Sequence, residues 1–527
     1  MDLINNLYQD IKKEQFANKI ALQYFGQKIT YKKLWKEIDK VASVLTQFGI
    51  KKGDCISIAL PNVVCAVTLL YGANKIGAVC NMMHPLLPVY KLRKYAQMTK
   101  SKMLFVSDVV VNEYADQLFG DYKLVVCNTE QYLIGVYKWA VKSQVAKKRS
   151  NTKNLYNFSQ LIKTKVQPTQ SVGEYDQLAI IMHGGGTTGE EKAVMLSNGN
   201  FISTQKSTID VICGDHLEKQ RCMLCALPLF HAFGLGACLH TMLANGIKVL
   251  LLPAYSTKQA VKLISKGKIN YMAGVPTLFD GLTRHKDFPS KGLRKLRYAF
   301  CGSDRLPKSV KERFDNAVKS VGGTATLDEG YGLTECTGVS CVNTKPNFKQ
   351  DSMGLCFSNS VAEVFENGKK MPRGTQGEIC IGGEGLFLGY FDDEKTTNQV
   401  VFQHGQKRWL KTGDWGCVDQ DGYIYYKDRI KRIAKVGGIT VFPSDVEREI
   451  EKVEGVARCI VAVVAHPYKG SVLKAFLEVE GDEEQILSNV KKTCRQKLAK
   501  WERPVGIEIK KLPLTASQKI DFKQLNS

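Results

Sequence analysis

The alternation of apolar and polar residues predicts a regular succession of helices and strands through residues 28–110. One run repeats apolar residues at helical spacing and ends at Gly49: Leu34, Ile38, Val41, Ala42, Leu45 and Phe48. The segment CISIAL then predicts a buried strand, NVVCAVTLLYGANKIGA a helix and KMLFVSD a second strand. Strands and helices that alternate at this spacing indicate a layered α/β domain.

The pattern changes near residue 431, where a smaller unit begins. A strand is predicted at 439–442, a helix at 444–453, two strands in CIVAVVAH and LKAFLEVE, and a helix at 485–499. We therefore predict an α/β protein with two domains. Residues 1–430 form a large, multi-layer α/β domain, and residues 431–527 form a small, mobile α+β domain.

Composition is that of an ordinary globular protein, with 44% hydrophobic and 24% charged residues in a chain of 527. No uninterrupted apolar run is long enough to span a membrane. The start MDLINNLYQDIKKEQ has no signal-peptide core, and the end QLNS is not a peroxisomal tripeptide. Sixteen cysteines are scattered singly, which is typical of reduced, buried thiols. We expect a cytoplasmic protein.

A net charge of +23 favours anionic partners such as nucleotides, CoA or anionic lipid. No helix-turn-helix, zinc-finger or RNP pattern occurs, so we expect no nucleic acid partner. Residues 131–153 carry six basic and no acidic residues, with apolar residues at helical spacing. This segment predicts either a helix lying peripherally on an anionic membrane or a solvated surface helix.

A glycine-rich loop, HGGGTTGEEK at 183–192, lies between two apolar, strand-like runs. Glycines allow main-chain N–H groups to approach a ligand, and hydroxyls beside an ammonium suit phosphate oxygens. The loop is no Walker motif, because Glu190 follows the second spaced glycine where a lysine is required. A flexible hairpin tip is the alternative. The candidate phosphate-binding residues are Thr187, Thr188, Gly189 and Lys192.

Five further segments occur in a recognisable order: CALPLFHAFGLGACLH (225–240), RYAFCGSDRLP (297–307), DEGYGLTECT (328–337), the long run 409–450 from WLKTGDWG to SDVEREI, and KKLPLTASQKIDFKQL (510–525). With the glycine loop they resemble the adenylate-forming superfamily. That superfamily includes acyl-CoA synthetases, firefly luciferase and peptide-synthetase adenylation domains. The resemblance covers nearly the whole chain.

The resemblance implies an acyl-CoA synthetase that uses ATP, Mg2+ and CoA. Tyr331 would stack on adenine, Thr334 would contact phosphate, and Asp414 would accept bonds from the ribose hydroxyls. Glu335 would hold Mg2+ jointly with phosphate oxygens. The other implied nucleotide contacts are Gly302, Ser303, Glu329, Gly332, Arg429, Lys435, Gly437 and Gly438.

Three further roles come from the same resemblance. Lys519 matches the catalytic lysine, which bridges the substrate carboxylate and the α-phosphate. Lys431 matches the hinge about which the small domain turns, bringing the Gly437-Gly438 turn to the site. His231 would border the acyl pocket and the reacting carboxylate as a catalytic residue, although a packed core histidine is the alternative.

The carboxylic acid that serves as substrate is predicted less directly than the nucleotide contacts. Peptide-synthetase domains carry an aspartate near 225–240 to anchor the substrate ammonium, and this chain has only Leu-Phe-His-Ala-Phe there. An unpaired ammonium in an apolar pocket is costly, which disfavours an α-amino acid. Small residues in the same segment favour a medium- or long-chain fatty acid, with aryl acids left open.

Two other functions are weighed against CoA ligation. An acyl-AMP ligase would pass its product to an acyl carrier protein, but the insertion that such enzymes carry before the small domain is absent between Glu335 and Thr412. A non-catalytic nucleotide or lipid binder is the rival of another class. It is motivated by four departures from the usual family pattern: Glu191, Ala193, Gln518 and Phe522.

Overall fold

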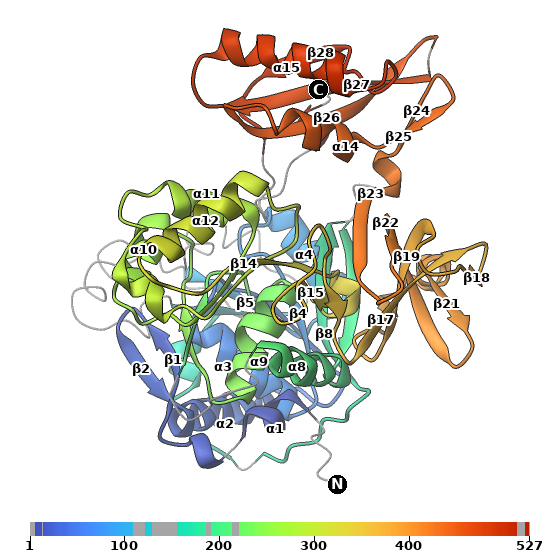
Figure 1. Ribbon diagram of the computed structural model, residues 1–527. Coiled ribbons are helices and arrows are strands. Elements are labelled where there is room, and N and C mark those ends of the chain that lie inside the picture. The colour runs from blue at the N-terminus through green and yellow to red at the C-terminus, as the bar shows by residue number, and fades with distance from the viewer. Residues whose placement is uncertain are drawn as a thin grey trace.

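The computed structural model describes residues 6–12, 14–108, 122–128, 155–163, 165–167, 169–185, 191–212, 221–468, 470–513 and 522–525. It has a large α/β body with a smaller α+β unit on top (Figure 1). This confirms the predicted fold class. No helix among the described residues is long and apolar enough to cross a membrane.

An eight-stranded sheet carries the glycine loop. Its order is β20 (Gly389–Tyr390), β9 (Glu191–Ser197), β8 (Leu178–Gly185), β4 (Val79–Met82), β3 (Cys55–Ala59), β5 (Met103–Ser107), β6 (Lys123–Cys127) and β7 (Leu155–Asn157). β8 and β9 pair antiparallel, with Gly184 opposite Lys192. The loop therefore joins two paired strands, as its flanks predict.

A nine-stranded sheet supplies the opposite side of the body. Its order is β16 (Leu355–Cys356), β15 (Cys341–Val342), β14 (Leu327–Tyr331), β13 (Tyr298–Cys301), β12 (Tyr271–Gly274), β10 (Cys222–Cys225), β11 (Lys248–Leu251), β1 (Ile20–Tyr24) and β2 (Gln27–Thr30). The central strands from β14 to β11 run parallel, so their carboxyl ends meet along one edge.

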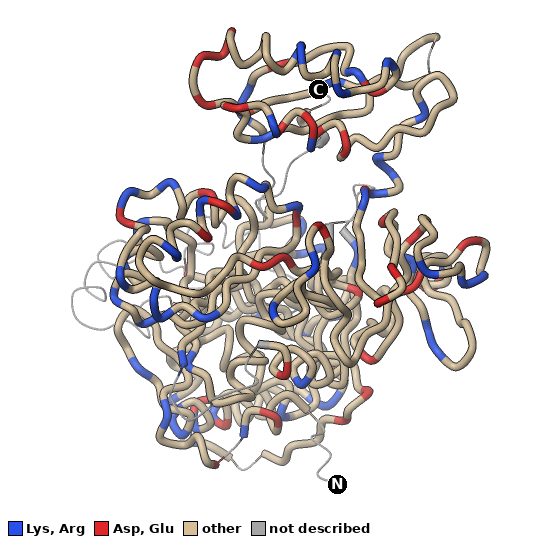
Figure 2. The backbone as a smooth tube through the Cα atoms, viewed as in Figure 1, with Lys and Arg blue, Asp and Glu red and all other residues tan. Residues whose placement is uncertain are grey.

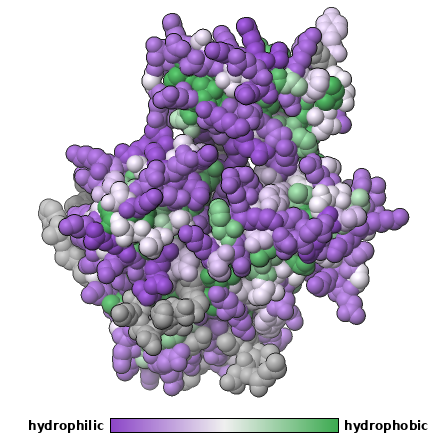
Figure 3. Space-filling view, in the orientation of Figure 1, coloured by the Kyte–Doolittle hydropathy of each residue, from purple (hydrophilic) through white to green (hydrophobic). Residues whose placement is uncertain are grey.

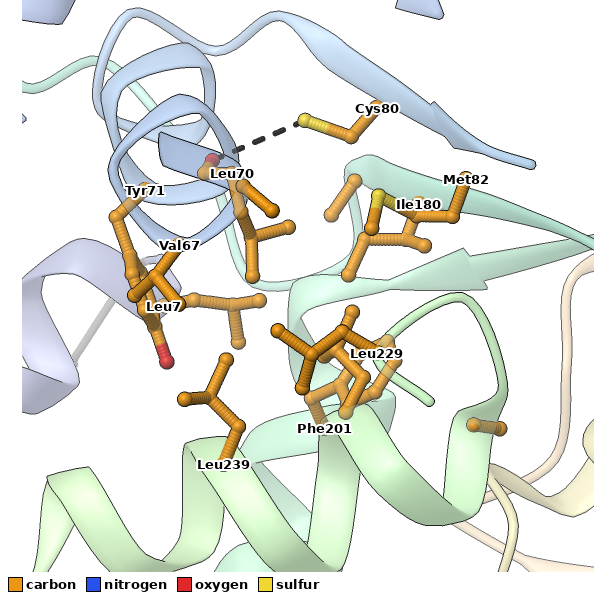
Figure 4. Close-up of a cluster of buried hydrophobic side chains, with 14 of the residues drawn as sticks. Leu7, Val67, Leu70, Tyr71, Cys80, Met82, Ile180, Phe201, Leu229 and Leu239 are labelled. Carbon is orange, nitrogen blue, oxygen red and sulfur yellow. Dashed lines mark hydrogen bonds between the residues drawn. The ribbon is translucent and has the colours of Figure 1, made fainter. Parts of the chain in front are cut away.

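Helices between these sheets form the main core. They are α2 (Tyr31–Gln47), α3 (Val64–Lys75), α8 (Asn198–Ile212) and a π-helix, η3 (Phe233–His240). Val67 and Leu70 of α3, Ile180 of β8, Phe201 of α8 and Leu239 of η3 meet in one buried cluster (Figure 4). Packing of η3 into this cluster fixes where its first residue, Phe233, lies.

The remaining helices of the body surround these core helices. They are α1 (Leu7–Ile11), α4 (Val89–Met98), α7 (Phe158–Leu161), α9 (Thr241–Ala244), α10 (Thr257–Ser265), α11 (Pro276–Arg284), α12 (Lys308–Ser320) and α13 (Glu394–Val400). Of these, α1, α7 and α9 also add buried residues to the main core. α10, α11 and α12 cover the outer face of the nine-stranded sheet, where a second cluster of buried residues forms.

A third, six-stranded sheet leads to the small domain. It consists of β17 (Ser360–Glu366), β18 (Lys369–Lys370), β19 (Gln376–Gly383), β21 (Val401–His404), β22 (Lys407–Val418) and β23 (Ile424–Arg429). In β22 and β23, Asp414 is the cross-strand partner of Arg429. Short 3-10 turns follow the strands at η5 (Thr334–Cys336) and η6 (Ile430–Arg432).

The small domain has its own sheet and core. Its elements are β24 (Ala434–Val436), β25 (Ile439–Val441), α14 (Pro443–Ile450), β26 (Val456–His466), β27 (Gly470–Val479), α15 (Glu483–Lys497) and β28 (Gly506–Ile509), and α16 (Phe522–Leu525) follows. The predicted helices and central strands are present, displaced by up to three residues at their ends. β24 and β28 were not predicted, because each is too short to show a period.

Candidate active site

The turn after β13 lies beside the end of β14. Cys301 is the register partner of Glu329, and the Gly302 N–H donates to the carbonyl of Gly274 at 3.1 Å. A Cβ on Gly302 would lie 3.2 Å from the Phe233 ring and 3.3 Å from the carbonyl oxygen of Gly330. The backbone thus comes close to η3, and Ser303 has a φ of 72°. Such crowding favours glycine at position 302.

Tyr331, Asp414 and Arg429 form one bonded group. The Tyr331 hydroxyl donates to Asp414 Oδ2 at 2.5 Å, and Arg429 Nε lies 3.0 Å from Asp414 Oδ1. Asp414 is fully buried, and this burial raises the pKa of its carboxyl despite the opposing charge of Arg429. The predicted ribose contact must therefore share a carboxylate that already accepts bonds from the protein. A carboxylate has about four acceptor positions, so sharing is chemically reasonable.

Neighbouring residues of β22 and β23 hold Asp414 in place. The Thr412 hydroxyl donates to the carbonyl of Ile379 at 2.6 Å and accepts the Asp414 N–H at 3.1 Å. Arg429 also donates to the Thr412 carbonyl at 3.2 Å. Gly413 has a φ of 72°, in the left-handed region, at a bulge where the register of β22 with β19 shifts.

Glu335 and Lys192 lie on either side of a residue that sequence reasoning missed, Tyr390. The Tyr390 hydroxyl donates to Glu335 Oε1 at 2.8 Å, and the Lys192 ammonium lies 4.5 Å from the centre of the Tyr390 ring. A Cβ on Gly184 would lie 3.9 Å from the Thr334 hydroxyl, so the end of β8 is also close to this group. The only sequence signal for Tyr390 was its place at the end of a glycine-punctuated segment.

Glu335 offers a single carboxylate, and this limits the kind of metal site. Among the described residues no three His, Cys, Asp or Glu side chains gather in a way that could hold a metal ion. Mg2+ commonly takes one or two carboxylates and completes its shell with water and substrate phosphates. The residues present fit a Mg2+ that arrives with a triphosphate, with Glu335 as its protein ligand, and they do not fit an all-protein cage.

One pocket, with a cavity volume of about 40 Å3, joins the turn residues to an apolar chamber. Its polar end is formed by Gly302, Ser303 and residues 330–332. The rest is lined by Thr208, Met223, Phe233, Ala237, Met242, Tyr271, Ala273, Phe300, Gly338, Val339, Val342 and Phe357. No charged side chain of the described residues lines it. The arrangement suits a ligand with one polar end and an uncharged, apolar remainder.

His231 lies beside this chamber without lining it. Its N–H donates to the Pro228 carbonyl at 3.2 Å, and its ring packs 4.9 Å from that of Phe230. Two residues further on, Phe233 does line the pocket. A catalytic role for His231 stays a prediction.

Two other predicted contacts have internal partners. Glu329 Oε1 accepts the N–H of Leu306 at 3.0 Å, and burial raises the pKa of the Glu329 carboxyl. Gly332 packs against Gly338, where a Cβ would lie 2.5 Å from a carbonyl oxygen. Both residues shape the turn around Tyr331, and their nucleotide contacts remain predictions.

The predicted small-domain residues lie in η6 and on the β24–β25 hairpin. Gly437 and Gly438 form the two-residue turn between β24 and β25, with φ values of 57° and 87°. Nothing lies within 4 Å of a Cβ built on either glycine, so the turn is open. Lys435 donates to Thr440 across the same hairpin at 2.6 Å, and Lys431 lies in η6.

Several predicted residues lie outside the described part of the chain. These are Thr187, Thr188 and Gly189 of the loop, Lys519, and the basic segment 131–153.

Ion pairs connect the small domain to the body. Figures 1 and 2 show the two parts facing each other, and in Figure 3 mostly hydrophilic residues cover the surface where they meet. Arg305 lies 2.5 Å from Glu451, Arg458 lies 3.6 Å from Asp304, and Arg284 pairs with Glu480. Asp304 and Arg305 directly follow the Gly302-Ser303 turn. The small domain therefore rests on the same loop that borders the pocket.

The body thus holds a linked Tyr331-Asp414-Arg429 group and, beside it, a pocket lined by Tyr331 and apolar residues, and a small domain rests on the turn that borders this pocket. Residues 10–391 match the AMP-binding enzyme model, and residues 445–519 match the model of the AMP-binding enzyme C-terminal domain. The chain belongs to the AMP-binding enzyme family, and its class is the ATP-dependent CoA ligases.

Relatives with different acids resemble the chain to a similar degree. A long-chain-fatty-acid–CoA ligase of Bacillus subtilis is 28% identical over 96% of this chain and 91% of its own length. A probable 4-coumarate–CoA ligase of Dictyostelium discoideum is also 28% identical, over 93% of this chain and 88% of its own length. The relatives therefore leave the acid open.

Solved structures share the fold. ATP-bound MatB from Rhodopseudomonas palustris has a TM-score of 0.84 at 22% identity, covering 99% of this chain and 98% of its own. The anthranilate CoA ligase AuaEII with anthranoyl-AMP has a TM-score of 0.86 at 23% identity, covering 100% and 97%.

Proposed function

We propose that this protein activates a medium- or long-chain fatty acid with ATP and transfers the acyl group to CoA. The observation that carries the proposal is the pocket, which has the nucleotide-side turn at one end and uncharged, mostly apolar residues beyond it. A carboxylate at the polar end would leave an alkyl chain among Met223, Met242 and Ala273. Each buried methylene would contribute about 0.8 kcal/mol to binding.

The chemistry proceeds in two transfers. A carboxylate oxygen of the acid attacks the α-phosphate of ATP, the α–β bridging bond breaks, and pyrophosphate leaves. Lys192 and the hydroxyls of Thr187 and Thr188 hold the departing phosphates, and Lys519 stabilises the charge that develops at the α-phosphate. The sulfur of CoA then attacks the acyl carbonyl and loses its proton, and AMP departs. When bound with ATP, Mg2+ neutralises phosphate charge beside Glu335.

The small domain serves both transfers by turning. We propose that the boundary lies between residues 430 and 431, with Lys431 as the hinge, since the small domain's own buried core begins at Ala434. In this scheme Lys519 acts in the first transfer, and the Gly437-Gly438 turn approaches the site in the second. Replacing Lys519 with alanine should cripple pyrophosphate release yet spare thioester formation from supplied acyl-adenylate. Equal loss of both would contradict this division.

The substrate is tested by acid-dependent pyrophosphate release. Saturated acids from about six to eighteen carbons, an aryl series such as the cinnamates, and no acid are compared at fixed MgATP. We expect kcat/KM to rise about fourfold per added methylene until the chamber is full. A flat response to chain length together with fast turnover of aryl acids would assign the enzyme to aryl acids instead.

The acceptor is tested in the same reactions. CoA or a phosphopantetheinylated carrier protein is added, and free acyl-CoA and acylated carrier are measured separately by mass spectrometry. We expect acyl-CoA to form and the carrier to remain unloaded. Loading of the carrier alone would support an acyl-AMP ligase, and no pyrophosphate release with any acid would support a non-catalytic binder.

A further inference from the structure

Tyr390 sits on the two-residue strand β20, beside the strand that leaves the glycine loop. Its register partner in β9 is Val194, two residues after Lys192. On either side the pairing continues, because Leu388 donates to the Met195 carbonyl at 2.9 Å and Phe391 donates to that of Ala193 at 2.8 Å. Tyr390 is thereby tied to the end of the phosphate-binding loop through the main chain.

The Tyr390 side chain is held firmly. It is only 6% exposed, its ring meets that of Phe387 edge-on at 5.0 Å, and its N–H donates to the Thr397 hydroxyl at 2.9 Å. These contacts fix the place of the hydroxyl, which donates from there to Glu335.

The same short segment holds Glu335 at two points. The Tyr390 hydroxyl donates to Glu335 Oε1 at 2.8 Å, and the Phe387 N–H donates to the Glu335 carbonyl at 2.8 Å. A bond to Oε1 restricts the carboxylate's rotation and leaves Oε2 as the oxygen presented to a cation. Partners of this kind orient metal-binding carboxylates and tune their affinity.

The face of the same ring carries Lys192, whose ammonium lies 4.5 Å from the ring centre. A cation–π contact of this kind is weak at a partly exposed site. A phosphate oxygen attracts an ammonium more strongly, so an incoming triphosphate can take Lys192 from the ring. Until then the ring keeps the flexible side chain beside Glu335.

We propose that Tyr390 is a positioning residue for adenylation: its hydroxyl orients Glu335 toward the metal-bearing phosphates, and its ring holds Lys192 ready for them. The proposal rests on the proposed function for its activity readout. In this proposal one side chain positions both Lys192 and Glu335, which are 143 positions apart in the sequence. In this role Tyr390 acts through Glu335 and Lys192.

Three variants separate the contributions of the Tyr390 hydroxyl, the Tyr390 ring and the packing around them. Tyr390→Phe keeps the ring over which Lys192 lies and removes only the bond to Glu335. Tyr390→Leu removes both. Thr397→Val is the matched control, because it removes a bond to the Tyr390 backbone and leaves the Tyr390 hydroxyl and ring unchanged. The melting temperature of each variant is measured first, to confirm that all are folded.

Binding of the metal ion is measured without turnover. Mn2+ stands in for Mg2+, and its binding to the enzyme–ATP complex is followed by electron paramagnetic resonance in the absence of any acid. For Tyr390→Phe we expect Mn2+ binding to weaken about tenfold, the effect of losing one hydrogen bond to a charged group. Thr397→Val should bind Mn2+ as the native enzyme does. Unchanged or tighter binding in Tyr390→Phe, or equal weakening in Thr397→Val, would overturn the proposal.

Activity provides the second readout. The Mg2+ concentration that half-saturates pyrophosphate release should rise about tenfold in Tyr390→Phe, with kcat at saturating Mg2+ nearly unchanged. Tyr390→Leu should also lose kcat, because Lys192 is no longer positioned. Equal kcat values for the two variants would refute the role of the ring. If the native enzyme releases no pyrophosphate with any acid, the proposed function fails, while the Mn2+ measurement still decides the role of the hydroxyl.

Discussion

Breaking the ion pair between Arg305 and Glu451 should loosen the small domain. Arg305 follows the Gly302-Ser303 turn of the body, and Glu451 lies just after α14 of the small domain, with 2.5 Å between Nη2 and Oε2. The other carboxylate oxygen of Glu451 accepts the Cys459 N–H at 3.1 Å. Arg305→Met would keep the aliphatic stem and remove the charge.

The energy of the Arg305–Glu451 ion pair can be estimated from how deeply its side chains are buried. The side chains of Arg305 and Glu451 are 27% and 14% exposed, whereas Arg284 and Glu480 are 37% and 54% exposed. Exposed pairs contribute about 0–1 kcal/mol, and breaking a fully buried pair costs about 3–5 kcal/mol. We place the Arg305 pair between these, at about 2 kcal/mol. That energy corresponds to about a thirtyfold change in the ratio of docked to undocked small domain.

The assay measures the distance between the domains. Spin labels are attached at Lys319 on α12 and at Ser488 on α15, both exposed, and distance distributions are recorded by pulsed electron resonance. In Arg305→Met the distribution should broaden and gain longer distances. Lys308→Met is the control, because the highly exposed Lys308 pairs only with Glu312 on its own helix among the described ion pairs. A distribution in Arg305→Met that superimposes on those of the native protein and the control would refute the reasoning.

Three further predictions concern the pocket, the nucleotide group and pH. Ala273→Phe should shift the preferred acid to shorter chains, with kcat/KM for the longest acid falling about fourfold per excluded methylene; an unchanged chain-length profile would contradict the assigned chamber. Arg429→Lys should raise the KM for ATP about tenfold, because lysine cannot bond both Asp414 and the Thr412 carbonyl; an unchanged KM would remove Arg429 from nucleotide binding. Burial raises the pKa of the Asp328 carboxyl, so the folded state holds that proton more tightly than the unfolded state. The free energy of unfolding, relative to Asp328→Asn, should therefore fall as pH rises above about 4 and level off above the folded-state pKa, as urea titrations can measure.

Local patterns sufficed for much of the fold. The helix at 31–47 and the strand at 55–59 follow from residues that are neighbours in sequence, and Gly49 ends the helix region with a φ of 80°. The glycine loop could likewise be placed between two strands, because its flanks are apolar runs. In each case the information lies within one element, where periodicity and turn chemistry can be read directly.

Contacts between distant segments could not be read in this way. Tyr390 reaches Glu335 and Lys192 only because β20 pairs with β9, and a two-residue strand has no period. Arg305 gave no signal either, since its partner lies in the other domain. The run 225–240 was recognised as apolar, but its π-helical stretch, which brings Phe233 to the pocket, comes from tertiary packing.

The loop 302–305 links ligand binding in the pocket to docking of the small domain. Gly302 and Ser303 form the polar end of the pocket, Asp304 pairs with Arg458, and Arg305 pairs with Glu451. These four residues are consecutive, so a shift of the turn by a fraction of an ångström at the pocket moves both ion-pair partners of the small domain. Charge pairs near contact distance weaken as they separate. A ligand that moves this turn therefore changes the free energy of docking of the small domain. This physical connection between occupancy and domain orientation needs no contact between the ligand and the small domain itself.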